Sequence, residues 1–308
     1  MLELGRVLVF GAAGIDTLAR STLQEGESVP GTITTSLGGV ACNVALNLAR
    51  LGVDVGLVSC VGDDDDGRRV VREIAESGVD TRYVSIRDAQ STARYVALLD
   101  AEGDMRLAVS SMRAVEALAV ADIQALQNDR RQAAAVVVDA NLSEATLRAV
   151  LQRDSDAVRC VDTVSAAKAV RVRENLRNID VLKTTPAEAS ALTGVGAERI
   201  DALCNALLER GAGSVFLSMG ARGLRVASRE SAVTLAARSP ESIQSTSGAG
   251  DALLAGIVYG RLTGEDIVGA AELGLAAATL TLSSGGSTLP ALTRDLLEET
   301  RKHCATNA

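Results

Sequence analysis

The stretch STSGAGDALLAGIVYG, from Ser245 to Gly260, places small residues before a single acid, Asp251, and an apolar run after it. Glycine lets the backbone turn tightly and approach a ligand closely, and the free amides at a helix N-terminus can hold phosphate oxygens. An acid beside such amides can take a proton from a hydroxyl group as that group attacks phosphorus. The stretch therefore indicates a phosphate site, with an ordinary helix start as the alternative interpretation.

Two common nucleotide-binding turns are excluded by their spacing. The dinucleotide pattern GxGxxG ends on a small residue, and Leu253 stands at that position here. The phosphate loop GxxxxGK[ST] is absent, because none of the three lysines, Lys168, Lys183 and Lys302, follows a glycine. A nicotinamide-dependent dehydrogenase therefore fits the sequence poorly, although it would share the alternation of strands and helices described below.

Two other turns carry glycines. SLGGVACN, from Ser36 to Asn43, precedes a helical pattern, and the Asn43 amide offers both a donor and an acceptor. SMGARG, from Ser218 to Gly223, follows an apolar run and is typical of either a nucleotide-binding turn or a hairpin turn. A plain loop-to-helix turn is the alternative at the first place, so neither turn decides the function alone.

The acidic run GDDDDGRRVVRE, residues 62–73, is a poor match to a calcium loop. Gly62 would occupy the first ligand position, which needs an acid. We interpret this run as the solvated start of a helix.

Composition limits the function further. The chain has 308 residues, is 47% hydrophobic but only 2% aromatic, and carries a net charge of −8. This acidity predicts no general attraction for nucleic acid or anionic membranes, and no run reaches the ~18 apolar residues of a membrane span. Five scattered cysteines without a CxxC pair, and no signal-peptide pattern, lead us to expect a cytoplasmic protein. The single histidine, His303, argues against a Ser-His-Asp hydrolase or a multi-histidine zinc centre.

Apolar strand patterns alternate with helical patterns along the chain. Near-continuous apolar strands between helices are typical of a mainly parallel sheet covered on both faces. Two polar segments without a helical pattern, 17–36 and 91–110, break the alternation, and we expect them to pair into a small sheet. Strands are predicted at Arg6–Ala12, Val53–Gly62, Ala133–Asn141, Ala157–Val164, Asn178–Thr185 and Gly213–Gly220.

Together these stretches resemble the ribokinase-like family, also called the phosphofructokinase B family of sugar and nucleoside kinases, nearly end to end. SLGGVACN is similar to its GG-x-x-x-N signature, GDDDDG to its G-x-D-x-x-G, and STSGAGD to its D-T-x-G-A-G-D. The resemblance implies an α/β fold, a ribokinase-like three-layer α/β/α domain with a mainly parallel sheet and a small β-sheet lid. It implies a single domain over residues 1–308, with 17–36 and 91–110 as lid segments and a homodimer formed through the lid.

The resemblance also implies roles for individual residues. Asp251 would be the general base for the acceptor hydroxyl, and the amides of Gly248, Ala249 and Gly250 would form an anion hole for the phosphoryl group. The sugar hydroxyls would be bound by Asp16, Gly38, Gly39 and Asn43. The nucleotide would be bordered by Ser218, Gly220 and Gly223, with the helix at Gly274–Leu282 beside the adenine.

The implied cofactors are ATP and Mg²⁺, and the resemblance leaves a need for a monovalent cation such as K⁺ open. Glu188 would hold Mg²⁺, and Thr185 stands where the family usually has an asparagine of the nucleotide-phosphate site. Gly14, Thr163 and Ser245 also replace usual family residues, and these replacements bear on substrate choice and catalytic efficiency rather than on fold.

Within the family, the stretches DANLSEATL, from Asp139, and VDTVSAAKAVRVRENL, from Val161, are most similar to pseudouridine kinases, which phosphorylate the ribose 5′-hydroxyl of a C-linked uracil nucleoside. Asn141 would then read the uracil ring, since its amide can donate and accept. We therefore expect an ATP-dependent kinase of a ribonucleoside 5′-hydroxyl, with pseudouridine as the leading acceptor. The alternatives are a sugar kinase for ribose, a ketohexose or an acidic sugar, and a catalytically weak ligand-binding member of the family.

Overall fold

The computed structural model describes residues 4–22, 24, 26–237, 240 and 242–305. Within these residues, nine strands form one sheet in the order β13-β12-β11-β10-β9-β8-β1-β4-β5. The pairs from β11 through β1 to β5 are parallel, and only β12 and β13 run antiparallel to their neighbours. The predicted, mainly parallel sheet is thus confirmed. Its strands are β1 Arg6–Phe10, β4 Asp54–Gly62, β5 Val84–Arg87, β8 Ala135–Asp139, β9 Val158–Asp162, β10 Val181–Thr184, β11 Ser214–Ser218, β12 Leu224–Ser228 and β13 Ala232–Leu235.

Helices cover both faces of this sheet, because its central strands are apolar on both sides. Val7 and Val9 of β1 pack into one core, and Leu8 and Phe10 pack into the other. The first core is closed by α1 Val40–Arg50, α2 Asp65–Glu76, α10 Ala249–Leu262, α11 Ile267–Leu282 and α12 Arg294–Ala305. The second is closed by α3 Arg113–Glu116, α4 Val120–Ala125, α6 Glu144–Val150, α7 Ala166–Ala169, η1 Val170–Asn178, α8 Pro186–Thr193 and α9 Ile200–Glu209, and the short α5, Gln127–Gln132, follows α4.

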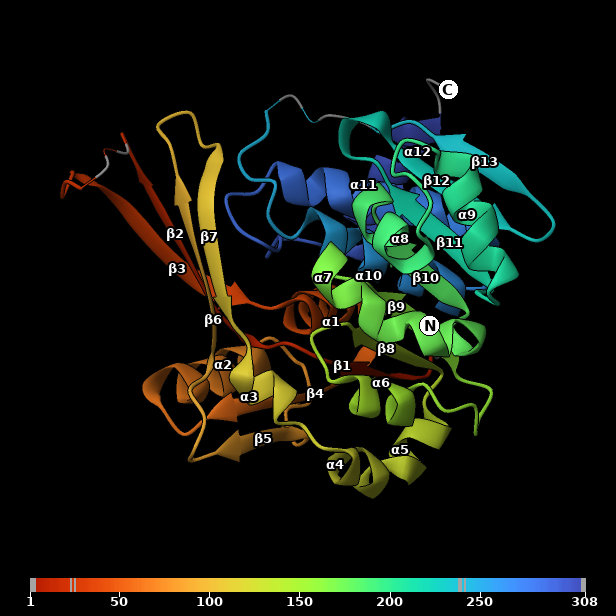
Figure 1. Ribbon diagram of the computed structural model, residues 1–308, viewed down its shortest axis with the longest axis horizontal. Helices are drawn as coiled ribbons and strands as arrows, with labels where there is room; N and C mark the ends of the chain where they lie inside the picture. The colour runs from red at the N-terminus through yellow and green to blue at the C-terminus, as the bar shows by residue number, and fades with distance from the viewer. Residues whose placement is uncertain (1–3, 23, 25, 238–239, 241, 306–308) are drawn as a thin grey trace.

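A second sheet, of four strands, projects from this body (Figure 1). Its order is β3-β2-β6-β7, with β2 Gly14–Ser21, β3 Gly31–Gly38, β6 Ala93–Leu99 and β7 Met105–Ser111. The two predicted polar segments therefore pair with each other, although residues 23 and 25 lie outside the described part of the chain. The strands extend beyond the predicted limits: β2 begins at Gly14, where a Cβ would lie 2.0 Å from the carbonyl oxygen of Ala93. This close pairing places Asp16 on the small sheet.

The topology brings distant segments to one edge of the large sheet. Strands β1, β8, β9, β10 and β11 are mutually parallel, so the residues that follow their carboxyl ends lie along the same edge. No helix in the described ranges combines the length and apolarity that a membrane crossing requires.

Candidate active site

Asp251 lies in the first turn of α10 and contacts α1. Its Oδ2 accepts a hydrogen bond of 2.7 Å from Nδ2 of Asn43, and only 9% of the residue is exposed. Burial raises the pKa of Asp251 to about 7, and the negative charge of Asp162 adds to this, while Lys183 and the Asn43 amide oppose it. A carboxylate whose pKa lies near neutrality is well matched to accept a proton from a hydroxyl group.

The start of α10 explains the glycines before Asp251. Gly248 has a φ of 75°, and a Cβ there would lie 1.8 Å from the carbonyl oxygen of Ser287. A Cβ on Gly250 would lie 2.9 Å from Nζ of Lys183. Both neighbours require glycine, and the first amides of this 14-residue helix have no partner within the helix. An anion can therefore approach the amides of Gly248, Ala249 and Gly250.

Asp16 and the paired glycines meet where the small sheet joins α1. A Cβ on Gly38 would lie 2.0 Å from Oδ1 of Asp16, so glycine makes room for this carboxylate. Burial raises the pKa of Asp16 to about 6, and the hydroxyl of Ser287, 3.5 Å from Oδ2, opposes the rise. Gly39 has a φ of 95° and packs against the backbone of Ala12. Asp16, Gly38, Gly39 and Asn43 are thus neighbours around the start of α1.

Asp139 holds this region together, a role that the sequence did not reveal. Its Oδ2 accepts from the amides of Ala12 (2.8 Å) and Ala41 (3.0 Å), and its Oδ1 accepts from the amide of Asn141 (2.8 Å). The residue is buried, and burial raises its pKa. Asp139 therefore joins the loop after β1, the start of α1 and its own turn.

Asn141 is buried in the turn that Asp139 fixes. Its Oδ1 accepts a hydrogen bond from Nζ of Lys168. The amide oxygen is therefore engaged within the protein, and the half-buried Lys168 is the polar group beside it. A role of Asn141 in binding the acceptor stays a prediction.

Glu188 and Thr185 form a capping box at the start of α8. The hydroxyl of Thr185 accepts from the amide of Glu188 (3.4 Å), and Oε2 of Glu188 accepts from the amide of Thr185 (2.9 Å). The hydroxyl of Thr163 also donates to Oε2 (2.5 Å). Threonine therefore satisfies the N-cap where the family usually has asparagine.

The carboxylates at this edge of the sheet suit a metal ion that is bound partly by the phosphates of a substrate. Within the described ranges, no group of three or more His, Cys, Asp or Glu side chains is arranged to bind a metal. Mg²⁺ is commonly held by one or two carboxylates together with substrate phosphates and water. Glu188 at the carboxyl edge of the sheet can supply one such carboxylate, so a phosphate-bound Mg²⁺ fits and a site made of protein ligands alone does not.

The predicted nucleotide residues line one cavity with the start of α10. This cavity has a volume of about 380 Å³, and its walls come from the β11–β12 turn, α10 and α11. Leu253, Leu275 and Leu282 make it largely apolar. It is also lined by Ser218, Gly220, Gly223, Ala249 and Gly250. A flat apolar ring can thus lie in the same cavity that reaches the candidate anion hole.

Lys183, Asp162 and Val164 are site residues that sequence reasoning missed. Lys183 is buried at the end of β10, and its Nζ lies 2.9 Å from Oδ2 of Asp162. Val164, just after β9, has a φ of 64° and is the non-glycine residue with positive φ in the described chain. This conformation is strained for a β-branched residue, and such strain is concentrated at functional sites. The scarcity of lysine was the available signal, since two of the three lysines lie at this edge.

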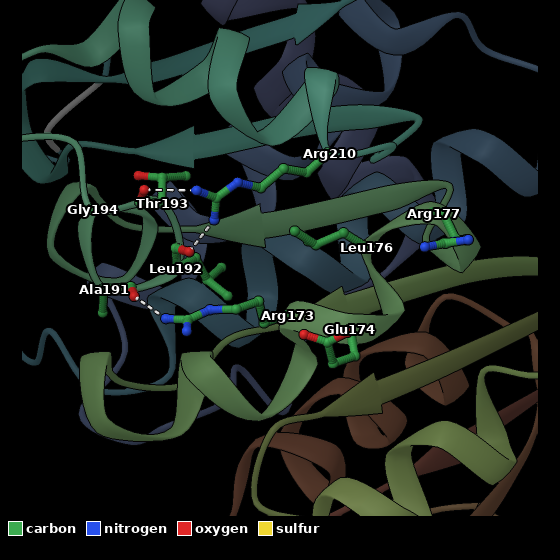
Figure 2. A pocket seen from close by; sticks show the side chains of 9 residues that line it. All are labelled: Arg173, Glu174, Leu176, Arg177, Ala191, Leu192, Thr193, Gly194 and Arg210. Atoms are coloured by element: carbon green, nitrogen blue, oxygen red, sulfur yellow. Dashed lines mark hydrogen bonds between the residues drawn. The ribbon is translucent and has the colours of Figure 1, made fainter.

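A second cavity, of about 560 Å³, lies beside the carboxyl end of α8 (Figure 2). Glu188 lies in the first turn of the same helix, at its other end. Arg173 donates to the carbonyl oxygen of Ala191 (2.9 Å), and Arg210 donates to those of Thr193 (2.8 Å) and Leu192. These arginines neutralise the carbonyl end of the helix. None of the predicted site residues lines this cavity, so it is not the candidate active site.

Comparison with known proteins gives the family. The sequence profile described as pfkB family carbohydrate kinase matches residues 5–294. The pseudouridine kinase of Escherichia coli (strain K12) is 32% identical over 262 residues, 83% of this chain and 84% of that protein. A carbohydrate kinase from Agrobacterium tumefaciens has a TM-score of 0.84 at 28% identity, with 97% of both chains covered. The Arabidopsis thaliana ribokinase solved with ribose and ATP has a TM-score of 0.82 at 20% identity, covering 97% of this chain and 99% of that one, which shows the fold alone.

These matches confirm the predicted family, the ribokinase-like fold and a phosphotransferase that acts on a sugar or nucleoside hydroxyl. The chain belongs to the pfkB family of carbohydrate kinases.

Proposed function

We propose that this protein is an ATP- and Mg²⁺-dependent kinase that phosphorylates the 5′-hydroxyl of pseudouridine. The observation that carries the proposal is the buried Asp251, whose pKa is raised to about 7 at the start of the helix that borders the apolar cavity. The likeness to the Escherichia coli pseudouridine kinase supports the choice of acceptor.

The chemistry follows from the arrangement of the site. The adenine would lie in the apolar cavity beside α11, and the triphosphate would point toward the amides of Gly248 to Gly250. Asp251 would take the proton of the 5′-hydroxyl as its oxygen attacks the γ-phosphorus, and ADP would leave. Mg²⁺, held by Glu188 through water, would neutralise charge on the β- and γ-phosphates when bound.

Asp16 would orient the acceptor. A carboxylate can accept hydrogen bonds from two neighbouring hydroxyls, as the 2′,3′-diol of a ribose presents. Asp16 is fixed where Gly38 leaves room for it, so the diol would hold the 5′-end of the ribose toward Asp251. This placement is part of the proposal and explains why the site would prefer a ribose to a sugar without a cis-diol.

The small sheet would act as the lid and form the dimer contact. Side chains directly opposite each other on paired strands lie on the same face of a sheet. The register of the small sheet therefore places Ile33, Leu107 and Val109 on the face opposite to that of Asp16. These side chains are 72%, 57% and 62% exposed. An apolar face of this kind is well suited to pack against a second copy of the chain.

An ADP-release assay on pseudouridine, uridine, ribose, fructose and an acidic sugar tests the acceptor. Pseudouridine exposes one ring N–H more than uridine, and a buried acceptor left without that partner costs about 1–3 kcal/mol. We expect pseudouridine to be preferred by roughly 5- to 150-fold, with a 5′-phosphate as the product. Turnover of ribose or fructose without turnover of pseudouridine would refute the nucleoside proposal and favour another sugar kinase. Asn141→Ala should narrow the preference if Asn141 reads the ring.

A further inference from the structure

Lys183 is a buried cation that has no role in the mechanism proposed above. It is 7% exposed, and its neighbour Val181 on the same side of β10 packs into the core beneath α10. Removing an ammonium from water is costly unless a partner or a ligand compensates for it. The usual role of lysine in keeping a protein surface soluble therefore does not account for the buried position of Lys183.

Asp162 compensates for part of this charge and is itself fixed in place. Its Oδ1 accepts from the amide of Val164 (2.7 Å), and its Oδ2 accepts from Nζ of Lys183 (2.9 Å). The strained backbone of Val164 follows from this arrangement, since the turn brings its amide to the carboxylate. Asp162 thus holds the ammonium in one position.

The ammonium lies directly beside the candidate anion hole. A Cβ on Gly250 would lie 2.9 Å from Nζ, so the glycine at this position makes room for Lys183. An ammonium has three donors, and Asp162 is the one hydrogen-bond acceptor that the described residues offer to it. Donors therefore remain for a ligand at the start of α10.

The charge state of Lys183 suits this position. Burial lowers its pKa, but the charges of Asp162, Asp251 and Glu188 outweigh burial, and the pKa is raised overall. The side chain is therefore a cation at neutral pH, placed among carboxylates that would otherwise repel a phosphate group.

We propose that Lys183 is a catalytic residue whose ammonium donates a hydrogen bond to an oxygen of the γ-phosphoryl group during transfer. The inference rests on the proposed kinase function. The bond between the acceptor oxygen and the γ-phosphorus forms, and the bond from that phosphorus to the ADP oxygen breaks. The hydroxyl proton passes to Asp251, and Lys183 keeps its own protons throughout. Its charge stabilises the negative charge that spreads over the phosphoryl oxygens.

Lys183→Met tests this role, with Lys302→Met on the exposed side of α12 as the matched control. Loss of one donor that stabilises transition-state charge costs about 10²- to 10³-fold in kcat. We expect that loss for Lys183→Met and an unchanged rate for Lys302→Met. Wild-type kcat in Lys183→Met would overturn the proposal.

Nucleotide binding gives a second readout that needs no turnover. A contact with the γ-phosphoryl group should weaken binding of a non-hydrolysable ATP analogue in Lys183→Met by at least about 10-fold more than binding of ADP. An equal effect on both nucleotides would mean that Lys183 only neutralises Asp162, and would overturn the proposal. A wild-type chain without turnover on any acceptor would refute the kinase function instead, while the ratio of the two affinities would still test Lys183.

Lys183→Met leaves the carboxylate of Asp162 without its ion-pair partner and could therefore destabilise the fold. The double variant Lys183→Met/Asp162→Asn removes both charges and should keep the wild-type melting temperature within a few degrees. Lys183→Arg keeps the charge, and partial recovery of kcat relative to Lys183→Met supports the proposal. Full activity in a folded double variant would overturn it.

Discussion

Asp251→Asn keeps the size and polarity of the side chain but removes its ability to accept a proton. A positioned general base contributes about 10²- to 10⁴-fold to a rate, so we expect the turnover of the variant to fall by that factor. The affinity for the acceptor should change much less, because Asn43 can still bond to the new amide. ADP release measures the first quantity, and calorimetric titration of the acceptor measures the second.

The same substitution should stabilise the folded chain at alkaline pH. The pKa of Asp251 is raised from 3.8 to about 7 in the folded protein. Since the folded-state pKa lies above the unfolded one, the cost of the buried charge is absent below pH ~4 and complete above pH ~7. Within this range, each rise of one pH unit adds ~1.4 kcal/mol to the free-energy cost of the buried charge. Asn carries no charge at any pH, so its stability advantage should grow by roughly 3 kcal/mol between pH 5 and pH 8.

Urea unfolding of both proteins at pH 5 and pH 8 measures this difference. Asp16, whose pKa is raised to about 6, titrates in the same range but is present in both proteins and cancels. An advantage that stays constant between the two pH values would refute the argument that burial controls Asp251. A variant that keeps more than about half of the wild-type turnover would refute its assignment as the general base.

Other substitutions test separate parts of the site and fold. Glu188→Gln should raise the Mg²⁺ concentration needed for half-maximal rate, and an unchanged titration would exclude Glu188 as a metal ligand. Thr185→Asn should leave the kinase activity unchanged or raise it. A ligand-binding protein that has lost turnover would instead stay inactive after this substitution. Asn47→Leu should raise the free energy of unfolding by about 1–3 kcal/mol, because both polar atoms of this buried amide lack partners among the described residues; a lower urea midpoint would contradict this. Leu107→Glu should convert a dimer to monomers in sedimentation velocity, and a monomeric wild type would refute dimerisation through the small sheet.

Much of the site could be predicted because its glycines stand in short patterns that are visible in the sequence. Gly38, Gly39 and Gly248 belong to the glycine-rich signatures, although the groups that crowd them in the fold lie far away in the sequence. The same patterns did not reveal why Gly250 is needed, since its neighbour Lys183 is far away in the sequence. The role of Asp139 could not be predicted for a related reason. An acid at the end of a strand gives the same sequence pattern whether it binds a ligand or accepts hydrogen bonds from three backbone amides.

The sequence by itself determined the alternation of strands and helices, the mainly parallel sheet and the glycine-rich turns with their acids. These features depend on hydrophobic periodicity and backbone freedom, which act over a few residues. Only the tertiary structure decided that Asn43 meets Asp251 and that Lys183 lies beside Gly250. It also decided the pKa of Asp251, because burial depends on α1 and α10 packing over the same sheet face. Proximity and desolvation are set by contacts between segments far apart in the chain, and no local pattern encodes them.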